Sequence, residues 1–197
     1  PFLEQWITYH RHIGVEHFYL YDNASDDYNE VKRFCDTCTD VTLIKWPYPH
    51  KTPNRGNSLS GQTAEQNTSL YKYSKHKWMI MTDLDEYIYS PSSSLMTTLQ
   101  KYENNRSSIC GLTIPCQWFG CGKQAVYNED FIHKLTWRKQ TPNRPKPGCG
   151  PKQIAIPSNV DIFSIHRCIK GKPEIELDAN VLRFNHYSSL TNHKSRY

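Results

Sequence analysis

The sequence predicts an α/β protein with a mostly parallel sheet flanked by helices, and with mixed or antiparallel strands in its C-terminal half. In the first half, segments with helical spacing alternate with short apolar runs, as in the right-handed crossovers of parallel sheets. In the second half, strand-like segments follow one another with few helices between them. The apolar run at residues 78–81 leads into two carboxylates, which favours a buried parallel strand whose tip opens into a crevice.

The first half is expected to supply three helices and three strands. Apolar residues recur at helical spacing from Leu3 to Ile13, and Gly14 ends that segment. An acidic, turn-forming loop follows the first strand at residues 22–27, and a loop rich in proline and basic residues covers 47–55. The helices are expected near residues 3–13, 28–38 and 58–74, and the strands at 17–21, 41–46 and 78–81.

The second half is expected to hold one helix and several strands. The helix covers residues 92–102 and has a serine cap, and a basic Pro/Gly-rich loop at 139–151 is expected to be mobile. Neither an internal repeat nor a clear boundary divides the chain, so we expect a single domain over residues 1–197. Strands are expected at residues 109–115, 131–138, 152–156, 160–166 and 181–187.

The composition is that of a folded globular domain. The chain has 197 residues, of which 37% are hydrophobic and 22% are charged. Its apolar runs are too short for a transmembrane span or a signal peptide. Because the first element starts at once after Pro1, we expect a piece of a longer protein, with any membrane anchor outside this chain.

The formal net charge of +5 indicates attraction of an anionic substrate. We expect no nucleic-acid partner, because there is neither a basic helix nor a stacking platform of the kind found in RNA-binding modules. A solvated basic face is the alternative for most of these residues. The basic side chains gather at Lys123, Lys134, Arg138, Lys139, Arg144, Lys146, Lys152, Arg167, Lys170 and Lys172.

Seven cysteines and three Asn-x-Ser sequons are compatible with a secretory compartment. Cys35 and Cys38 have the spacing of a zinc or redox pair, but no second close pair follows them. A structural disulfide, or two ordinary thiols, is therefore favoured over a metal site. The sequons lie at Asn23, Asn67 and Asn105.

The two carboxylates of Asp83-Leu84-Asp85 predict a site for a divalent ion and a phosphate or diphosphate. Mn²⁺ and Mg²⁺ take oxygen ligands and often keep only one or two protein carboxylates, leaving other positions for water and substrate phosphates. Glu86 adds a third acid at the same place. The alternative, a strand end with solvated acids, is favoured for an isolated Asp-x-Asp, but the preceding apolar run and Glu86 favour the functional interpretation.

Several further motifs occur in a characteristic order over nearly the whole chain. They are Glu4-x-Trp6-x-x-x-His10 with Gly14, Tyr21-Asp22-Asn23-x-Ser25-x-Asp27, Gln62-x-Ala64-x-x-Asn67, Trp78 with Asp83-Leu84-Asp85-Glu86-Tyr87, Trp118-Phe119-Gly120, His166, and Asn185-His186-Tyr187. Together they resemble glycosyltransferase family 92, a branch of the GT-A type of nucleotide-sugar glycosyltransferases. The resemblance implies a Rossmann-like GT-A sheet in a single catalytic domain, with a first strand upstream of residue 1.

The resemblance also implies a metal site and a donor site. Asp83 and Asp85 would hold the ion, with Asp83 closer to the ribose and the sugar, and His186 would complete the metal shell. His166, which also ends an expected strand, is the weaker competitor for that role.

Asp22 and Asn23 would contact the base or ribose of the nucleotide, although a turn that simply favours these residue types is the alternative. Lys152 would approach the diphosphate once the preceding loop closes, and a solvated lysine is the alternative.

An inverting transferase needs a base near the acceptor hydroxyl. We expect Asp130 or Glu129 in that role and Asp161 as a second candidate, with a surface role as the alternative for all three. Trp118 and Phe119 offer an apolar platform for an acceptor sugar, and core packing is the alternative.

The function that this resemblance implies is metal-dependent transfer of a hexose, with galactose favoured, from a UDP-sugar to a glycan hydroxyl, with inversion. The alternatives are an inactive GT-A-like module that binds glycan or nucleotide, and an Asp-x-Asp phosphatase. We expect the secretory or Golgi lumen as its location, within a membrane-anchored protein, or the cytoplasm if the source is microbial or viral.

Overall fold

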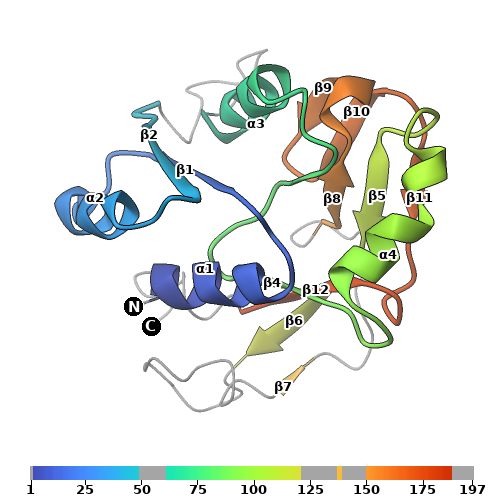
Figure 1. Ribbon diagram of the computed structural model, residues 1–197, viewed down its shortest axis with the longest axis horizontal. Coiled ribbons are helices and arrows are strands. Elements are labelled where there is room, and N and C mark those ends of the chain that lie inside the picture. The colour runs from blue at the N-terminus through green and yellow to red at the C-terminus, as the bar shows by residue number, and fades with distance from the viewer. Residues whose placement is uncertain (1, 49–60, 121–136, 139–149, 188–197) are drawn as a thin grey trace.

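The computed structural model describes residues 2–48, 61–120, 137–138 and 150–187, which form a mixed α/β fold (Figure 1). The first half follows the expected order of helices and strands. Strands β1 and β2 pair in parallel, from Phe18 opposite Val41 to Asp22 opposite Lys45. The elements of this half are α1 (Phe2–His12), β1 (Phe18–Asp22), α2 (Tyr28–Asp36), β2 (Val41–Lys45) and α3 (Gly61–Lys72).

The remaining strands form two four-stranded sheets and a hairpin. One sheet has the order β11-β5-β8-β3, the other has the order β4-β12-β6-β7, and β9 pairs antiparallel with β10. The strands are β3 (Met79–Ile80), β4 (Glu86–Tyr89), β5 (Gly111–Ile114), β6 (Cys116–Gly120), β7 (Trp137–Arg138), β8 (Lys152–Ala155), β9 (Val160–Ser164), β10 (Arg167–Gly171), β11 (Glu174–Glu176) and β12 (Arg183–His186).

The expectation of one mostly parallel sheet is therefore not met by the described strands, which form small mixed sheets. The strand before the two carboxylates is short, and it pairs antiparallel with β8, so its prediction as a parallel strand was wrong. An apolar run indicates that a strand is buried but does not encode the direction of its neighbour, which here comes from a distant part of the chain. Strands β4, β6, β10 and β11 were not expected.

Parts of four expected segments lie outside the described residues. These parts are most of the loop expected at 47–55, the start of the helix expected at 58–74, most of the strand expected at 131–138, and nearly all of the loop expected at 139–151. Within the chain that the structure describes, no helix has both the length and the apolar character that a membrane crossing requires.

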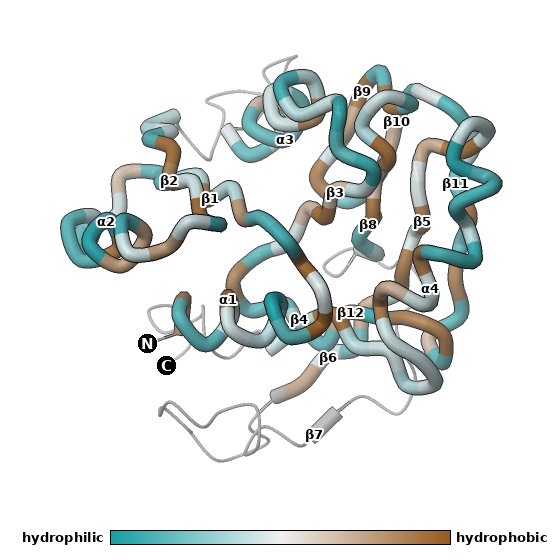
Figure 2. Tube along the Cα trace, in the orientation of Figure 1, coloured by the Kyte–Doolittle hydropathy of each residue, from teal (hydrophilic) through white to brown (hydrophobic). Residues whose placement is uncertain are grey.

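The main core lies between helix α4 (Leu95–Lys101) and the central strands β5 and β8 (Figure 2). Leu95 and Leu99, one turn apart on α4, pack in the same cluster as the fully buried Leu112 and Ile154. Ser94 caps this helix, because its Oγ accepts a hydrogen bond from the Thr97 N–H at 3.0 Å. A short 3₁₀ helix (Glu103–Asn105) follows α4, and another (Pro157–Asn159) follows β8.

A second cluster joins α1 and β1 to the sheet that contains β4 and β12. Trp6 and Ile7 of α1 pack with Phe18, Tyr87 and Tyr187. Trp6 also donates its indole N–H to the Glu86 carbonyl at 2.9 Å, which fixes the beginning of β4 against α1. The first helix is thus tied directly to the segment that follows the two carboxylates.

A bidentate side-chain contact holds α3 against β9. The Asn67 amide group donates to the carbonyl of Phe163 and its Oδ1 accepts from the Phe163 N–H, both at 2.8 Å. Phe163 is fully buried, so its backbone groups have little access to water. Asn67 therefore acts as a structural clamp, which is incompatible with a glycan on its amide nitrogen in the folded protein.

We predict that Asn67→Ala lowers the free energy of unfolding by about 2–3 kcal/mol, because it leaves buried backbone groups without their partner. Urea unfolding followed by circular dichroism measures this loss. Asn104→Ala, at an exposed asparagine, is the matched control and should change stability by less than about 0.5 kcal/mol. Equal stabilities for the two variants would contradict the clamp.

Candidate active site

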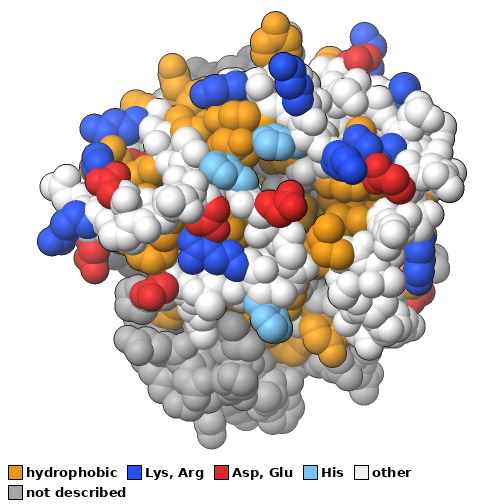
Figure 3. Space-filling view, viewed as in Figure 1, with side chains coloured by type: hydrophobic (Ala, Val, Ile, Leu, Met, Phe, Trp, Pro, Cys, Tyr) orange, Lys and Arg blue, Asp and Glu red, His pale blue; other side chains and the backbone are white. Residues whose placement is uncertain are grey.

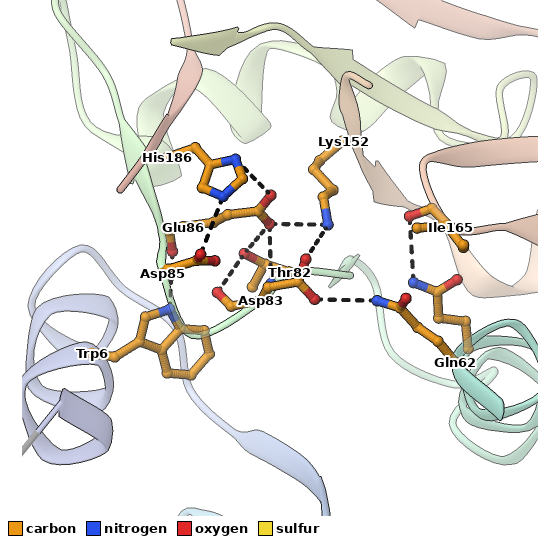
Figure 4. A network of polar contacts seen from close by, with 10 residues as sticks. Trp6, Gln62, Thr82, Asp83, Asp85, Glu86, Lys152, Ile165 and His186 are labelled. Carbon is orange, nitrogen blue, oxygen red and sulfur yellow. Dashed lines mark hydrogen bonds and ion pairs between the residues drawn. The ribbon is translucent and has the colours of Figure 1, made fainter. Parts of the chain in front are cut away.

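The two carboxylates lie in a turn between β3 and β4, and the Glu86 side chain closes that turn (Figure 4). Glu86 Oε2 accepts hydrogen bonds from the Asp83 N–H at 3.0 Å and from the Thr82 hydroxyl at 3.1 Å. The Glu86 N–H donates in return to the Asp83 carbonyl at 3.1 Å. A buried carboxylate thus fixes the backbone that presents both aspartates.

Lys152, the first residue of β8, supplies the countercharge for this buried acid. Its Nζ lies 3.0 Å from Glu86 Oε2 and 2.9 Å from Asp83 Oδ2. The Lys152 and Glu86 side chains are each only 3% exposed, whereas that of Asp83 is 48% exposed. Lys152 is therefore not a solvated lysine, because its ammonium group is bound within the protein, and its approach to the diphosphate stays a prediction.

The pKa values of this pair reflect burial and mutual attraction. Burial raises the pKa of Glu86, and the nearby Lys152 ammonium opposes that rise. Burial also lowers the pKa of Lys152, but the negative charges of Glu86 and Asp83 outweigh this effect and leave it above its usual value. Lys152 thus stays positively charged at neutral pH.

Asp85 points to a different partner from that of Asp83. Its Oδ2 lies 3.2 Å from His186 Nε2, although the two residues are 101 positions apart in the chain. Strand β12 brings them together, because His186 pairs opposite Glu86 in the antiparallel β12–β4 ladder, and the Tyr187 N–H donates to the Asp85 carbonyl at 2.8 Å. Figure 4 shows His186 above Asp85 and Lys152 above Asp83, on opposite sides of the turn.

The structure separates the two histidines that the sequence offered as metal ligands. His186 contacts Asp85, whereas His166 lies between β9 and β10, where burial lowers its pKa and the Lys152 charge lowers it further. The contact with Asp85 makes His186 the better placed of the two.

The residues present suit a divalent ion that shares its coordination with a substrate. Within the described residues, no group of three or more His, Cys, Asp or Glu side chains is arranged to hold a metal. Asp85 and His186 provide one carboxylate and one imidazole, which fits an ion that takes its other ligands from water and phosphate. Both Asp83 oxygens have protein partners, Lys152 on one and Gln62 at 3.2 Å on the other.

Asp22 lines a small cavity at the ends of the two parallel strands. The cavity has a volume of about 200 Å³ and is lined by Asp22, Ala24, Tyr28, Lys45 and Pro47. The Lys45 ammonium lies 4.5 Å from the centre of the Tyr28 ring, a cation–π contact. Asn23 is exposed and does not line this cavity. The sequence placed Asp22 at a strand end, but nothing in it singled out Tyr28 or Lys45.

The first turn of α3 connects the strand-end cavity with the carboxylate turn. Trp46, which follows Lys45, donates its indole N–H to the Gly61 carbonyl at 2.9 Å. The next residue, Gln62, donates its amide N–H to Asp83 Oδ1. Sequence reasoning gave Gln62 no role, although it belongs to a motif that supports the family resemblance.

The aromatic rings expected to bind an acceptor pack against the end of β12 and the residue that follows it. Trp118 stacks on His186 with ring centroids 4.5 Å apart, and Phe119 stacks on Tyr187 at 5.1 Å. Strand β6 brings Trp118 opposite His186 in a parallel ladder with β12. Both rings are partly buried, so they combine a packing role with a position beside the candidate site.

Of the three residues expected as catalytic base, the structure describes only Asp161. Glu129 and Asp130 lie outside the described residues. Asp161 is on β9, where its side chain is 63% exposed and 4.0 Å from Lys170 Nζ. The role of all three residues stays a prediction.

Glu65 on α3 is a partly buried acid that sequence reasoning missed. Burial raises its pKa to about 7, a hydrogen bond from Ser69 opposes the rise, and the charge of Asp83 adds to it. Ser69 also contacts the Tyr21 hydroxyl at 2.7 Å, so Glu65 belongs to a polar chain that reaches β1. A glutamate in a helix with a mostly polar sequence is normally expected in solvent, so the sequence did not indicate that Glu65 is partly buried.

We predict that Glu65 makes stability depend on pH between about 4.5 and 7. The Glu65 carboxyl group binds its proton more tightly in the folded protein than in the unfolded chain, so the free energy of unfolding falls as pH rises through this window. Glu65→Gln should remove that fall, which is about 3.5 kcal/mol at most at 1.4 kcal/mol per pKa unit. Urea unfolding at several pH values measures it, with the exposed Glu16→Gln as control, and parallel profiles for wild type and Glu65→Gln would refute the prediction.

Comparison with known proteins connects this geometry to a family. The chain is 25% identical over 189 residues to a glycosyltransferase family 92 protein of Oryza sativa subsp. japonica, covering 94% of the chain and 31% of that protein. It is 30% identical over 200 residues to a family 92 protein of Ricinus communis, covering 94% of the chain and 32% of that protein.

A third relative has a named activity. The chain is 24% identical over 200 residues to galactan beta-1,4-galactosyltransferase GALS2 of Arabidopsis thaliana, covering 96% of the chain and 37% of that protein. The chain thus spans about a third of the length of the curated relatives that it matches. The model of the family described as "Glycosyltransferase family 92" matches residues 2–197, and the chain that brings Asp85 against His186 therefore belongs to glycosyltransferase family 92.

Proposed function

We propose that this chain carries the donor site of a metal-dependent glycosyltransferase that moves a hexose, galactose, from a UDP-sugar to a glycan hydroxyl with inversion. The observation that carries the proposal is the contact between Asp85 and His186, beside the turn that presents Asp83. Membership of family 92 and the galactosyltransferase names of two relatives support the reaction class and the sugar.

Asp85 and His186 would hold Mn²⁺ or Mg²⁺, with Asp83 as the adjacent carboxylate toward the ribose and the sugar. The bound ion would supply Lewis-acid stabilisation of the departing diphosphate. Asp83 would accept a hydrogen bond from a sugar or ribose hydroxyl through its exposed side, while Lys152 and Gln62 fix its orientation. The turn, fixed by the buried Glu86 carboxylate, would therefore position the donor without rearrangement of its backbone.

The strand-end cavity would receive the uracil base. Tyr28 offers an aromatic face for stacking, and Asp22 and Lys45 offer an acceptor and a donor for the polar edge of the base. Binding sites in open α/β sheets lie at the carboxyl ends of parallel strands, which is where Asp22 and Lys45 sit. This position supports a GT-A-type arrangement of the donor relative to β1 and β2.

On the acceptor side, Trp118 and Phe119 would border the sugar ring, and one of Glu129, Asp130 or Asp161 would remove the proton of the acceptor hydroxyl.

On the face drawn in Figure 3, basic and acidic side chains are interspersed rather than gathered in one basic patch, which supports a small anionic donor over a nucleic acid. The sequons at the exposed Asn23 and Asn105 support location in the secretory lumen.

We predict that UDP-galactose with Mn²⁺ raises the melting temperature of the purified chain more than either ligand alone does. Ligand binding to the folded state alone stabilises by about 2.7 kcal/mol at a hundredfold excess over Kd. Asp85→Asn should abolish the metal-dependent part of the shift, because a neutral amide is a weaker ligand than a carboxylate. Differential scanning fluorimetry measures these shifts, and release of UDP in the presence of β-galactan measures transfer.

Asp36→Asn, at an exposed carboxylate on α2, is the matched control and should behave as the wild type does. Normal turnover by Asp85→Asn would remove the metal assignment. Stabilisation by UDP-galactose without any release of UDP would favour the binding-module alternative. Indifference to every nucleotide sugar would overturn the proposal.

A further inference from the structure

Two cysteine side chains from distant parts of the chain meet beside β8, on the side of the sheet away from the carboxylate turn. Cys110 directly precedes β5 and is buried, whereas Cys168 lies in β10 and is partly buried. Cys110 Sγ and the Cys168 N–H both contact the side chain of Gln153, and the Cys168 thiol donates a hydrogen bond to the Lys170 carbonyl at 3.1 Å. Both thiols are free, and each lies near enough to affect the pKa of the other.

Gln153 holds both cysteines in place. Its Nε2 lies 3.7 Å from Cys110 Sγ, and its Oε1 accepts a hydrogen bond from the Cys168 N–H at 2.9 Å. Gln153 is fully buried in the centre of β8, so its amide is itself fixed. A single side chain thus fixes the thiol of one cysteine and the backbone of the other.

The backbone around Cys110 is fixed from both sides as well. Its N–H donates to the Pro173 carbonyl at 2.8 Å, and its carbonyl accepts from the Ile156 N–H at 2.7 Å. Around Cys168, space is limited, since a Cβ on Gly171 would lie 2.9 Å from Cys168 Sγ. The two cysteines are therefore held against the same buried side chain, in a setting that allows little other movement.

We propose that Cys110 and Cys168 form an intramolecular disulfide bond that joins the start of β5 to the β9–β10 hairpin. This bond closes a long loop of the chain, and such cross-links stabilise mainly by restricting the unfolded state. Neither cysteine takes part in the donor site, so this inference is independent of the proposed function.

The oxidation requires an external disulfide, such as glutathione disulfide or a protein dithiol oxidase. Cys168, the less buried cysteine, loses its proton and attacks the external disulfide, which releases one thiol and leaves a mixed disulfide on Cys168. Cys110 then loses its proton and attacks the Cys168 sulfur, which releases the second thiol. Two protein thiols are oxidised to one disulfide, and one external disulfide is reduced to two thiols.

The protonation of these thiols points to a structural bond rather than a rapid redox switch. Burial, together with the neighbouring Cys168, raises the pKa of the Cys110 thiol to about 12. Burial also raises the pKa of Cys168. Since thiolates are the reactive species, both groups exchange slowly in the folded protein, and the bond forms most readily during oxidative folding.

The test is disulfide mapping of the purified chain after refolding in a buffer of reduced and oxidised glutathione. Free thiols are alkylated under denaturing conditions, and non-reduced peptides are identified by mass spectrometry. We expect a cross-linked peptide pair containing Cys110 and Cys168, with a mass two hydrogens below that of the separate peptides. Recovery of both cysteines in alkylated form, or their linkage to other cysteines, would overturn the proposal.

A stability measurement complements the map. The oxidised wild type should melt several degrees above its reduced form, and the double variant Cys110→Ser/Cys168→Ser should lose this difference. Cys38→Ser, in the Cys35-x-x-Cys38 pair whose thiols the structure also describes as free, is the matched control and should keep it. Because the mapping uses the wild-type chain, failure of a variant to fold leaves the proposal testable. An unchanged shift in the double variant would contradict the assignment.

Discussion

The arrangement of the site depends on the ion pair between Glu86 and Lys152. Both side chains are almost completely buried, and an isolated charge in that position would carry a large desolvation penalty. The pair joins the first residue of β4 to the first residue of β8, two strands of different sheets. It therefore links the β11-β5-β8-β3 sheet to the β4-β12-β6-β7 sheet at the point where the aspartates emerge.

Because Glu86 also binds the Asp83 N–H and the Thr82 hydroxyl, this ion pair sets the direction of the turn. The turn sends Asp83 toward Lys152 and Gln62 and Asp85 toward His186, so two carboxylates one residue apart have different electrostatic surroundings. One is oriented by a fixed ammonium group and keeps an exposed side, while the other meets an imidazole. Such a division suits a site that must orient a sugar and coordinate an ion at the same time.

Local sequence signals predicted local structure well. β1, β2 and α2 were predicted from periodicity and turn residues, which depend on neighbours in the sequence. The predicted direction of β3 was wrong, because its partner β8 comes from a distant part of the chain. Strand β4 was not expected, because its partner β12 is also distant and because a charged residue, Glu86, begins this buried strand. The burial of Lys152 in an ion pair had no local signal for the same reason, since its two carboxylate partners lie far away in the sequence. The nearness of His186 to the aspartates came only from family resemblance, and the Tyr28–Lys45 contact had no sequence signal.

The most direct test of this account is a double-mutant cycle between Lys152 and Glu86, measured as the free energy of unfolding in urea. We expect Lys152→Met and Glu86→Gln each to cost roughly 3–5 kcal/mol, because each leaves a buried partner without its countercharge. The double variant should lose less than the sum of the two, with a coupling energy of about 2 kcal/mol or more. Additive losses, with coupling below about 0.5 kcal/mol, would contradict the claim that this pair organises the site.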